Sequence, residues 1–205
     1  MQFADSHEAL ATDRILLTRI HGSGISRVKE LGDAGTLRQL DRCGSGQAAA
    51  ARVAATLSCA NVTAALAIED AGSGDIIGLT AVAALEPEEK RATLAPIWSS
   101  GRLDEVVLIS HVTHLMTRHA FEVLAVERAE VHLDWRLRRT LELYTGLGFH
   151  CEGRLRGYFA CNQGPSADAA VLSVVRSGWP AIADRQRRLL ASEAWRCRLP
   201  SDRPP

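Results

Sequence analysis

His132 is one residue whose type and position suggest chemistry. It lies in the segment Glu127–Asp134, ERAEVHLD, which predicts a strand. A histidine side chain titrates near neutral pH, so it can take a proton from an ammonium group directly or through a water molecule. A histidine packed into the strand is the alternative interpretation.

The junction Ile97–His111, IWSSGRLDEVVLISH, runs from a strand-like segment into an amphipathic helix. In many α/β proteins such a junction binds phosphate through glycines and the backbone N–H groups at the start of the helix. Here the junction has one glycine, Gly101, followed by Asp104 and Glu105. Their carboxylates suit the helix dipole but repel a phosphate, so the sequence leaves open what this junction binds.

Two arginine-rich groups lie beside tryptophans. Trp135–Arg139, WRLRR, opens a predicted helix, and Arg185–Arg198 lies in the C-terminal tail around Trp195. Arginines beside a tryptophan can bind phosphates and stack on a base. A solvated helix face or a contact between subunits is the alternative for both groups.

Other titratable residues predict less. His111 and His114 share a helix face, but a metal site needs more ligands and no nearby side chain has suitable spacing, so we expect no metal. The acidic cluster around Glu86 predicts a solvated hairpin tip. The five cysteines are odd in number and show no C-x-x-C spacing, which predicts reduced thiols rather than a zinc ribbon or a disulfide framework.

The composition is that of an ordinary globular chain. Its 205 residues suffice for one domain with a full core, or for a domain plus an extension. The 24 basic and 24 acidic residues balance, which predicts no global attraction to nucleic acid or membrane. No window approaches 18 uninterrupted apolar residues, and the acidic N-terminus lacks the apolar core of a signal peptide, so we expect a cytoplasmic protein.

Hydrophobic patterning predicts an α/β fold with a mixed, partly antiparallel sheet. Strands are expected at 13–20, 63–70, 74–85, 91–98, 127–134, 153–160 and 169–176. Pro96 disturbs the fourth of these and indicates an edge or a bulge. Helices are expected at 26–35, 46–58, 103–124 and 138–149, with one more from Ala181 onward. The apolar stripe of the long helix is Ile109, Val112, Met116, Ala120 and Val123.

The segments LYTGLGFHCEGRLRGYF and DAAVLSVVRSGWP resemble the end of a GNAT-superfamily acyltransferase of the RimJ/RimL-like branch. The matching residues are Gly148–Phe149, Glu152–Gly153, Leu155–Arg156, Asp168 and Trp179–Pro180. The resemblance implies a GNAT domain over residues 10–182, with a central twisted sheet of about seven strands flanked by helices. An arginine-rich helical extension would follow at 183–205.

The resemblance also implies a reaction, transfer of an activated acyl group to the amine of a small molecule or protein. Tyr144 stands four residues before Gly148, the family's position for the acid that protonates the leaving group. With His132 it forms the expected catalytic pair. The residues expected to bind the donor are Leu94, Ala95, Ile97, Trp98, Arg102, Val107, His111, Trp135, Arg138 and Arg139.

Several positions depart from the family pattern. The glycines of the coenzyme A pyrophosphate loop fall near Glu105 and Val107, the strand base falls near Thr93, and Pro96 removes an N–H from the strand that should hold the acyl carbonyl. Acetyl-CoA is the default donor of the family. An aminoacyl-tRNA, as in some natural-product pathways, or a carrier-protein thioester would also agree with a missing pyrophosphate loop. A GNAT-fold binding module without catalysis remains the contrasting hypothesis, which a groove filled by Trp98 would favour, and a homodimer is a further expectation.

Overall fold

The structure is a computed structural model, and it describes residues 10–20, 26, 28, 30–31, 37–40, 64–94, 97–160 and 165–192. The predicted helix at 46–58, the proline at 96 and four of the five cysteines lie outside these residues. Cys151 is described and is a free, exposed thiol. Within the described residues, no helix is both long and apolar enough to span a membrane.

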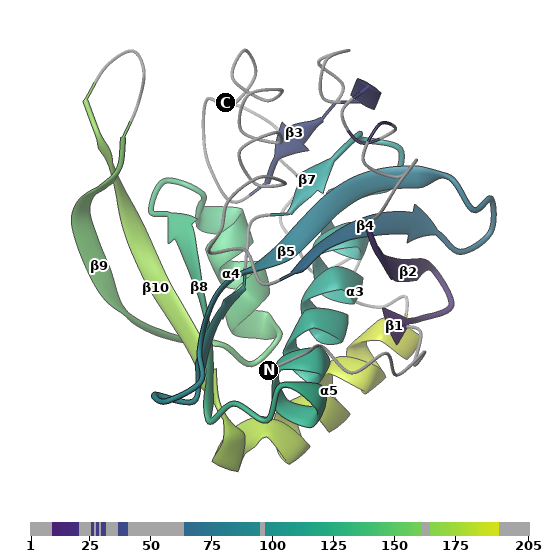
Figure 1. The fold of residues 1–205 in the computed structure, drawn as a ribbon. Coiled ribbons are helices and arrows are strands. Elements are labelled where there is room, and N and C mark those ends of the chain that lie inside the picture. The colour runs from purple at the N-terminus through teal and green to yellow at the C-terminus, as the bar shows by residue number, and fades with distance from the viewer. Residues whose placement is uncertain are drawn as a thin grey trace.

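One mixed sheet organises the described part of the chain, as the hydrophobic pattern predicts (Figure 1). Its main path runs β1-β2-β4-β5-β6-β8-β10-β9, and β7 pairs with β5 and with β3. The ten strands are β1 (Leu10–Ala11), β2 (Ile15–Arg19), β3 (Arg38–Gln39), β4 (Ala64–Asp70), β5 (Ile76–Glu86), β6 (Arg91–Leu94), β7 (Trp98–Ser99), β8 (Arg128–Asp134), β9 (His150–Phe159) and β10 (Ala167–Val175). The predicted number of about seven is exceeded because β1 and β3 are two-residue strands and the predicted strand 91–98 is divided into β6 and β7.

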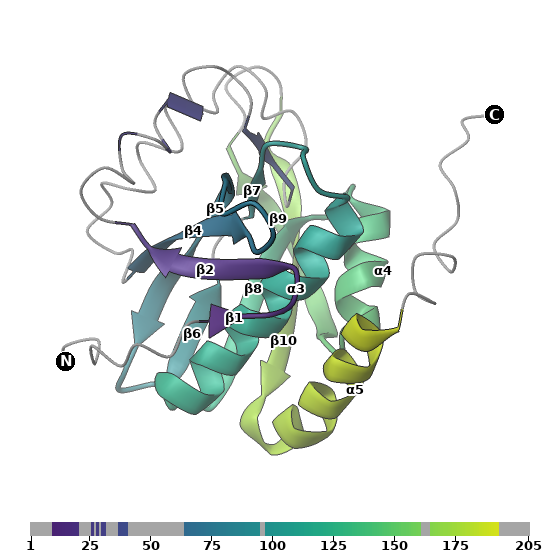
Figure 2. The ribbon, with the colours of Figure 1, turned by 90° about the vertical axis from the view of Figure 1, so that its right-hand side faces the viewer.

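Three helices lie together on one face of the sheet (Figure 2). They are α3 (Glu105–Arg118), which continues into a π-helical turn (His119–Val123), α4 (Arg138–Gly146), and α5 (Trp179–Ala191), which follows a 3-10 turn (Arg176–Gly178). The main core joins these helices to the sheet through alternate residues of β8 and β10, among them Val131, Leu133 and Leu172. Because strand side chains alternate between faces, Arg128, Glu130 and His132 lie on the opposite face of β8.

The sheet divides between β6 and β8. These two strands pair in parallel over three residues only, from Arg91 opposite Arg128 to Thr93 opposite Glu130. Beyond that point the chain continues as β7, which pairs with β5, while β8 continues beside β10. Figure 1 shows the two halves of the sheet diverging there.

Gly78 allows β5 and β7 to approach closely. A Cβ atom at this position would lie 2.2 Å from the carbonyl oxygen of Trp98. The Trp98 side chain packs with Val28, Leu37 and Leu79 in a second, smaller core on the sheet half formed by β4 and β5. This packing fixes the start of the junction that leads into α3.

Helix α5 is packed against α3 by a buried polar chain. His114 Nδ1 lies 3.0 Å from Gln186 Oε1, and Gln186 Nε2 donates to the carbonyl oxygen of Leu147 at 2.9 Å. Gln186 is fully buried, and Trp179 and Ala183 belong to the main core. The expected domain boundary at 182/183 falls within α5. The division into a domain at 10–182 and an arginine-rich extension at 183–205 stays a prediction.

Candidate active site

The start of α3 binds a carboxylate of its own chain. Asp104 is the N-cap residue, and its Oδ1 accepts hydrogen bonds from the N–H groups of Val106 at 3.0 Å and Val107 at 3.2 Å. Glu105 forms an ion pair with Arg38. Two of the N–H groups that could cradle a phosphate, those of Val106 and Val107, are thus satisfied internally, and a negative charge already stands at the positive end of the helix.

Most of the expected donor-binding residues of this region are buried. Leu94, Ile97, Trp98 and Val107 are each at most 6% exposed, and Ala95 lies outside the described residues. Trp98 fills the smaller core. Their burial leaves these side chains little surface for contact with a donor.

The two polar residues predicted here face other partners. His111 Nδ1 lies 2.8 Å from the Thr12 hydroxyl, beside the turn between β1 and β2. Arg102 donates to Asp75 at 2.8 Å on the surface. Among the described residues, no group of three or more His, Cys, Asp and Glu side chains could hold a metal ion.

Tyr144 is the buried residue of α4. Its ring meets Phe149 edge to face, with 5.3 Å between the ring centroids, and both belong to the main core. The structure therefore places Tyr144 on the expected helix, on the helix-covered side of the sheet and not on the face that carries His132. Its role as the acid stays a prediction.

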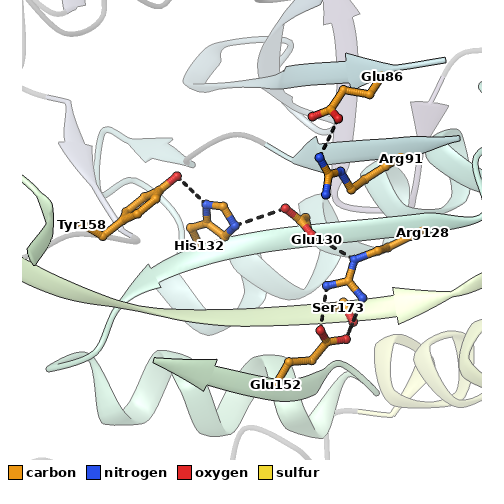
Figure 3. Close-up of polar contacts among 8 residues, drawn as sticks. All are labelled: Glu86, Arg91, Arg128, Glu130, His132, Glu152, Tyr158 and Ser173. Carbon is orange, nitrogen blue, oxygen red and sulfur yellow. Dashed lines mark hydrogen bonds and ion pairs between the residues drawn. The ribbon is translucent and has the colours of Figure 1, made fainter. Parts of the chain in front are cut away.

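His132 is held between two partners on the face of the sheet opposite α3, α4 and α5 (Figure 3). Its Nε2 lies 3.2 Å from Glu130 Oε1, and its Nδ1 lies 2.7 Å from the Tyr158 hydroxyl. Burial lowers the pKa of His132, against the opposing effect of the Glu130 carboxylate. The imidazole is therefore neutral at neutral pH and can accept a proton.

Glu130 connects this histidine to a larger ionic network (Figure 3). Arg128 donates to Glu130 at 2.9 Å and forms two hydrogen bonds with Glu152 at 2.6 and 2.9 Å. Ser173 donates to Glu152 as well, and Arg128 followed by Ser173 lowers the pKa of Glu152 to about 2. Glu86, at the end of β5, binds Arg91 of β6 at 2.5 Å. The network fixes the Glu130 carboxylate beside His132.

Trp135 lies just before α4 and contacts two arginines, Arg138 of α4 and Arg154 of β9. The guanidinium carbons of Arg138 and Arg154 lie 4.8 and 5.3 Å from its ring centroid. Asp134 is fully buried and accepts two hydrogen bonds from the Arg136 guanidinium at 2.9 and 2.7 Å. Arg138 and Arg139 are exposed, which places two guanidinium groups on the surface at this end of the sheet.

Sequence reasoning missed Glu130, Arg128 and Tyr158. The two-residue period of β8 was a usable signal, because Arg128, Glu130 and His132 must share one face of a strand. The alternation of side chains along a strand could not predict that Tyr158 lies beside His132. Between Ala167 and Ala169 the pairing of β9 with β10 shifts register, and Gly157 adopts a positive φ of 63°.

Comparisons with known proteins identify the fold. No family model and no curated protein sequence matches the chain. Among solved structures, a T. thermophilus protein named as an acetyltransferase is 25% identical over 89% of this chain and 97% of its own, with a TM-score of 0.71. A GCN5-related N-acetyltransferase of Brucella melitensis is 19% identical over 92% of this chain and 87% of its own, also at 0.71.

The chain has the GNAT acetyltransferase fold. The predicted fold class is confirmed. The neighbouring structures are named as acetyltransferases, which agrees with the prediction of an acyltransferase. A more distant GNAT neighbour is the spermidine/spermine N-acetyltransferase of Vibrio cholerae, 14% identical over 83% of this chain and 98% of its own, with a TM-score of 0.63.

Proposed function

We propose that this chain is an N-acyltransferase that transfers an activated acyl group to an amine. The observation that carries the proposal is the divergence of β6 and β8 in a GNAT sheet, directly beside the neutral His132 on the face opposite the three helices. Where strands diverge, the backbone groups of their facing edges are available to an extended ligand. A neutral imidazole beside that opening supplies a base for the amine proton.

The start of α3 does not fit the diphosphate of the usual donor. The N–H groups of Val106 and Val107 already bind Asp104, and Glu105 follows in the first turn. Acetyl-CoA is the donor that the fold suggests, but the residues at α3 disagree with the diphosphate of coenzyme A. The transfer itself requires only an activated ester or thioester carbonyl.

A second donor class is favoured by the arginines around Trp135. An aminoacyl-tRNA presents an ester-activated acyl group, a terminal base that can stack on an aromatic ring, and phosphates that lie outside the pocket. Trp135 with Arg138 and Arg139 offers this chemistry near the end of β8. Membership of the RimJ/RimL-like branch and a role in a natural-product pathway are further parts of this proposal.

The acceptor in this proposal is an amine that reaches the face carrying Glu130 and His132. Glu86 is paired with Arg91, and Glu130 shares Arg128 with Glu152. These three carboxylates and two guanidinium groups leave one negative charge in excess, which favours a cationic amine before it is deprotonated. The Vibrio cholerae neighbour acts on spermidine and spermine, so polyamines are the first acceptors to test. One structure of the Vibrio cholerae spermidine N-acetyltransferase is dodecameric, and self-association of this chain stays a proposal.

The experiment combines binding with transfer. Coenzyme A and acetyl-CoA are titrated into the purified chain by calorimetry, and the chain is then incubated with acetyl-CoA or aminoacyl-tRNA together with spermidine and other primary amines. The proposal expects an amide product, detected by mass spectrometry, with at least one donor. A folded chain that forms no amide with either donor class would overturn it and favour the binding module.

A further inference from the structure

We infer that Tyr158 is the catalytic residue that receives the proton of the acceptor amine, with His132 and Glu130 acting through it as positioning residues. The inference rests on the proposed function and deepens it. It reassigns the direct contact with the substrate from the histidine to a tyrosine on the neighbouring hairpin.

The hydrogen bonds of His132 set the direction of the relay. A carboxylate can only accept, so the contact between Glu130 Oε1 and His132 Nε2 places the ring proton on Nε2. Nδ1 then carries the lone pair and accepts the hydroxyl proton of Tyr158 at 2.7 Å. Both ring nitrogens are engaged, so a proton from the substrate reaches His132 through Tyr158.

Accessibility along the relay leads to the same conclusion. The Glu130 side chain is 10% exposed and the His132 side chain 18%, whereas Tyr158 is 48% exposed as a residue. Exposure therefore rises steadily from the carboxylate to the phenol. A ligand that approaches this face of the sheet meets the Tyr158 side chain before His132 and Glu130.

The β9–β10 hairpin is built to hold Tyr158 in this place. Asp168 accepts the N–H of Gly157 at 2.7 Å and the Nε of Arg154 at 2.6 Å, and the first of these bonds is the main cause of its lowered pKa. Gly157 takes the positive φ that this turn of the strand requires. The Tyr158 ring then stands edge-on to His132, with 5.0 Å between the centroids and an interplanar angle of 84°.

The charges around the relay favour a concerted transfer. Burial, followed by the negative charge of Glu130, raises the pKa of Tyr158, so the phenol is neutral before the reaction. As the amine nitrogen attacks the acyl carbonyl, its proton passes to Tyr158 Oη and the phenol proton passes to His132 Nδ1. The C–N bond forms, and the bond from the carbonyl carbon to the leaving sulfur or oxygen breaks. The leaving group takes up a proton from solvent, and the imidazolium of His132 later releases the proton it received back to solvent, so the net reaction moves one proton from the amine to the leaving group.

Glu130 stabilises the imidazolium formed in this step. The other charged groups near His132 are Arg128 on β8 and Arg91 on β6, both of which disfavour the imidazolium. Arg128 is held by Glu152, and β10 presents the apolar Val171 opposite His132. Glu130 is therefore the group that favours a positive charge on the ring.

The test replaces the hydroxyl and follows kinetics across pH. Tyr158→Phe should lower kcat about 100-fold or more while KM for the donor stays unchanged. Cys151→Ser, on the same strand and outside the relay, is the matched control. Glu130→Gln should lower kcat and also move the acid limb of the pH–rate profile to lower pH, because loss of the carboxylate lowers the pKa of His132; a purely structural role would not move that limb.

Two results separate the inference from the function beneath it. If the wild-type chain transfers no acyl group, both the proposed function and this role of Tyr158 are wrong. An active wild type whose Tyr158→Phe variant keeps a rate within about 3-fold, against the 100-fold loss expected of a general acid–base group, removes the role of Tyr158 alone. Nitrogen NMR of labelled histidine adds a readout that does not need activity: the proton must reside on Nε2 of His132, and a proton on Nδ1 would overturn the relay.

Discussion

Replacing Asp104 separates the two effects of its carboxylate at the start of α3. Its Oδ1 accepts two backbone hydrogen bonds, from Val106 and Val107, and its charge meets the helix dipole. Loss of an N-cap side chain costs about 1 kcal/mol of stability, and loss of a charge at a helix end costs roughly 0.3–1 kcal/mol. Asp104→Ala should therefore lower the free energy of unfolding by about 1–2 kcal/mol. Asp104→Asn, which keeps a capping oxygen, should lose roughly 0.3–1 kcal/mol at most.

The same pair of variants measures how strongly the carboxylate excludes a phosphate. A phosphate bonded to these N–H groups would stand about 4 Å from the Asp104 carboxylate, where two unit charges repel by about 1 kcal/mol in water and by roughly 4 kcal/mol at an effective dielectric of 20. Because Asp104 is exposed, the lower figure applies. Asp104→Asn should therefore bind coenzyme A about 5-fold more tightly than the wild type.

Calorimetric titration of coenzyme A into the wild type, Asp104→Asn and Asp104→Ala checks this difference, with urea unfolding of each variant for stability. Glu88→Gln, an exposed carboxylate in the β5–β6 turn, is the control for a general change in charge. Micromolar binding by the wild type that Asp104→Asn leaves unchanged would refute the reasoning. It would mean that the phosphates bind without approaching α3.

Two further predictions concern stability. Gly78→Ala should lower the free energy of unfolding, measured in urea, by about 1–3 kcal/mol, because its Cβ would lie 2.2 Å from the Trp98 carbonyl oxygen. Gly146→Ala, with open space around its Cβ, should leave that free energy unchanged or raise it by up to about 1 kcal/mol. Equal effects of the two variants would contradict the close approach of β5 and β7. Burial lowers the pKa of His114 in the folded chain, so its contribution is complete above the unfolded value of 6.5 and is lost as pH falls below it. The urea midpoint of the wild type should therefore fall more between pH 7 and pH 5 than that of His114→Gln, and parallel losses would show that His114 does not titrate on unfolding.

Much of the fold could be predicted because each element has its own periodic signal. The segments at 63–70, 127–134 and 138–149 became β4, β8 and α4 within a few residues of their predicted ends. The end of the long helix was less predictable. Its stripe holds as far as Ala120, but the π-helical turn, in which Leu124 N–H bonds to the carbonyl of His119, rotates the chain and leaves Val123 40% exposed.

Only part of the candidate site could be predicted from the sequence, because the partners of His132 are set by contacts between strands. His132 could be named from its own chemistry, and Asp104 and Glu105 from their place before a helix. The partners of His132 come from a neighbouring position on β8 and from β9, which lies two strands away across β10. Only the register of the hairpin brings Tyr158 there, and a register shift at a left-handed glycine is not visible in a pattern of alternating residues.

The motif residues that carry the family resemblance have a structural explanation that connects them to the proposed chemistry. Glu152 binds Arg128, and Arg128 in turn holds Glu130 beside His132. Asp168 holds Gly157, the residue before Tyr158. Both acidic residues therefore position the two ends of one relay. Conservative changes at Glu152 and Asp168 should accordingly affect the proton transfer through Glu130 and Tyr158, although neither carboxylate contacts the relay histidine.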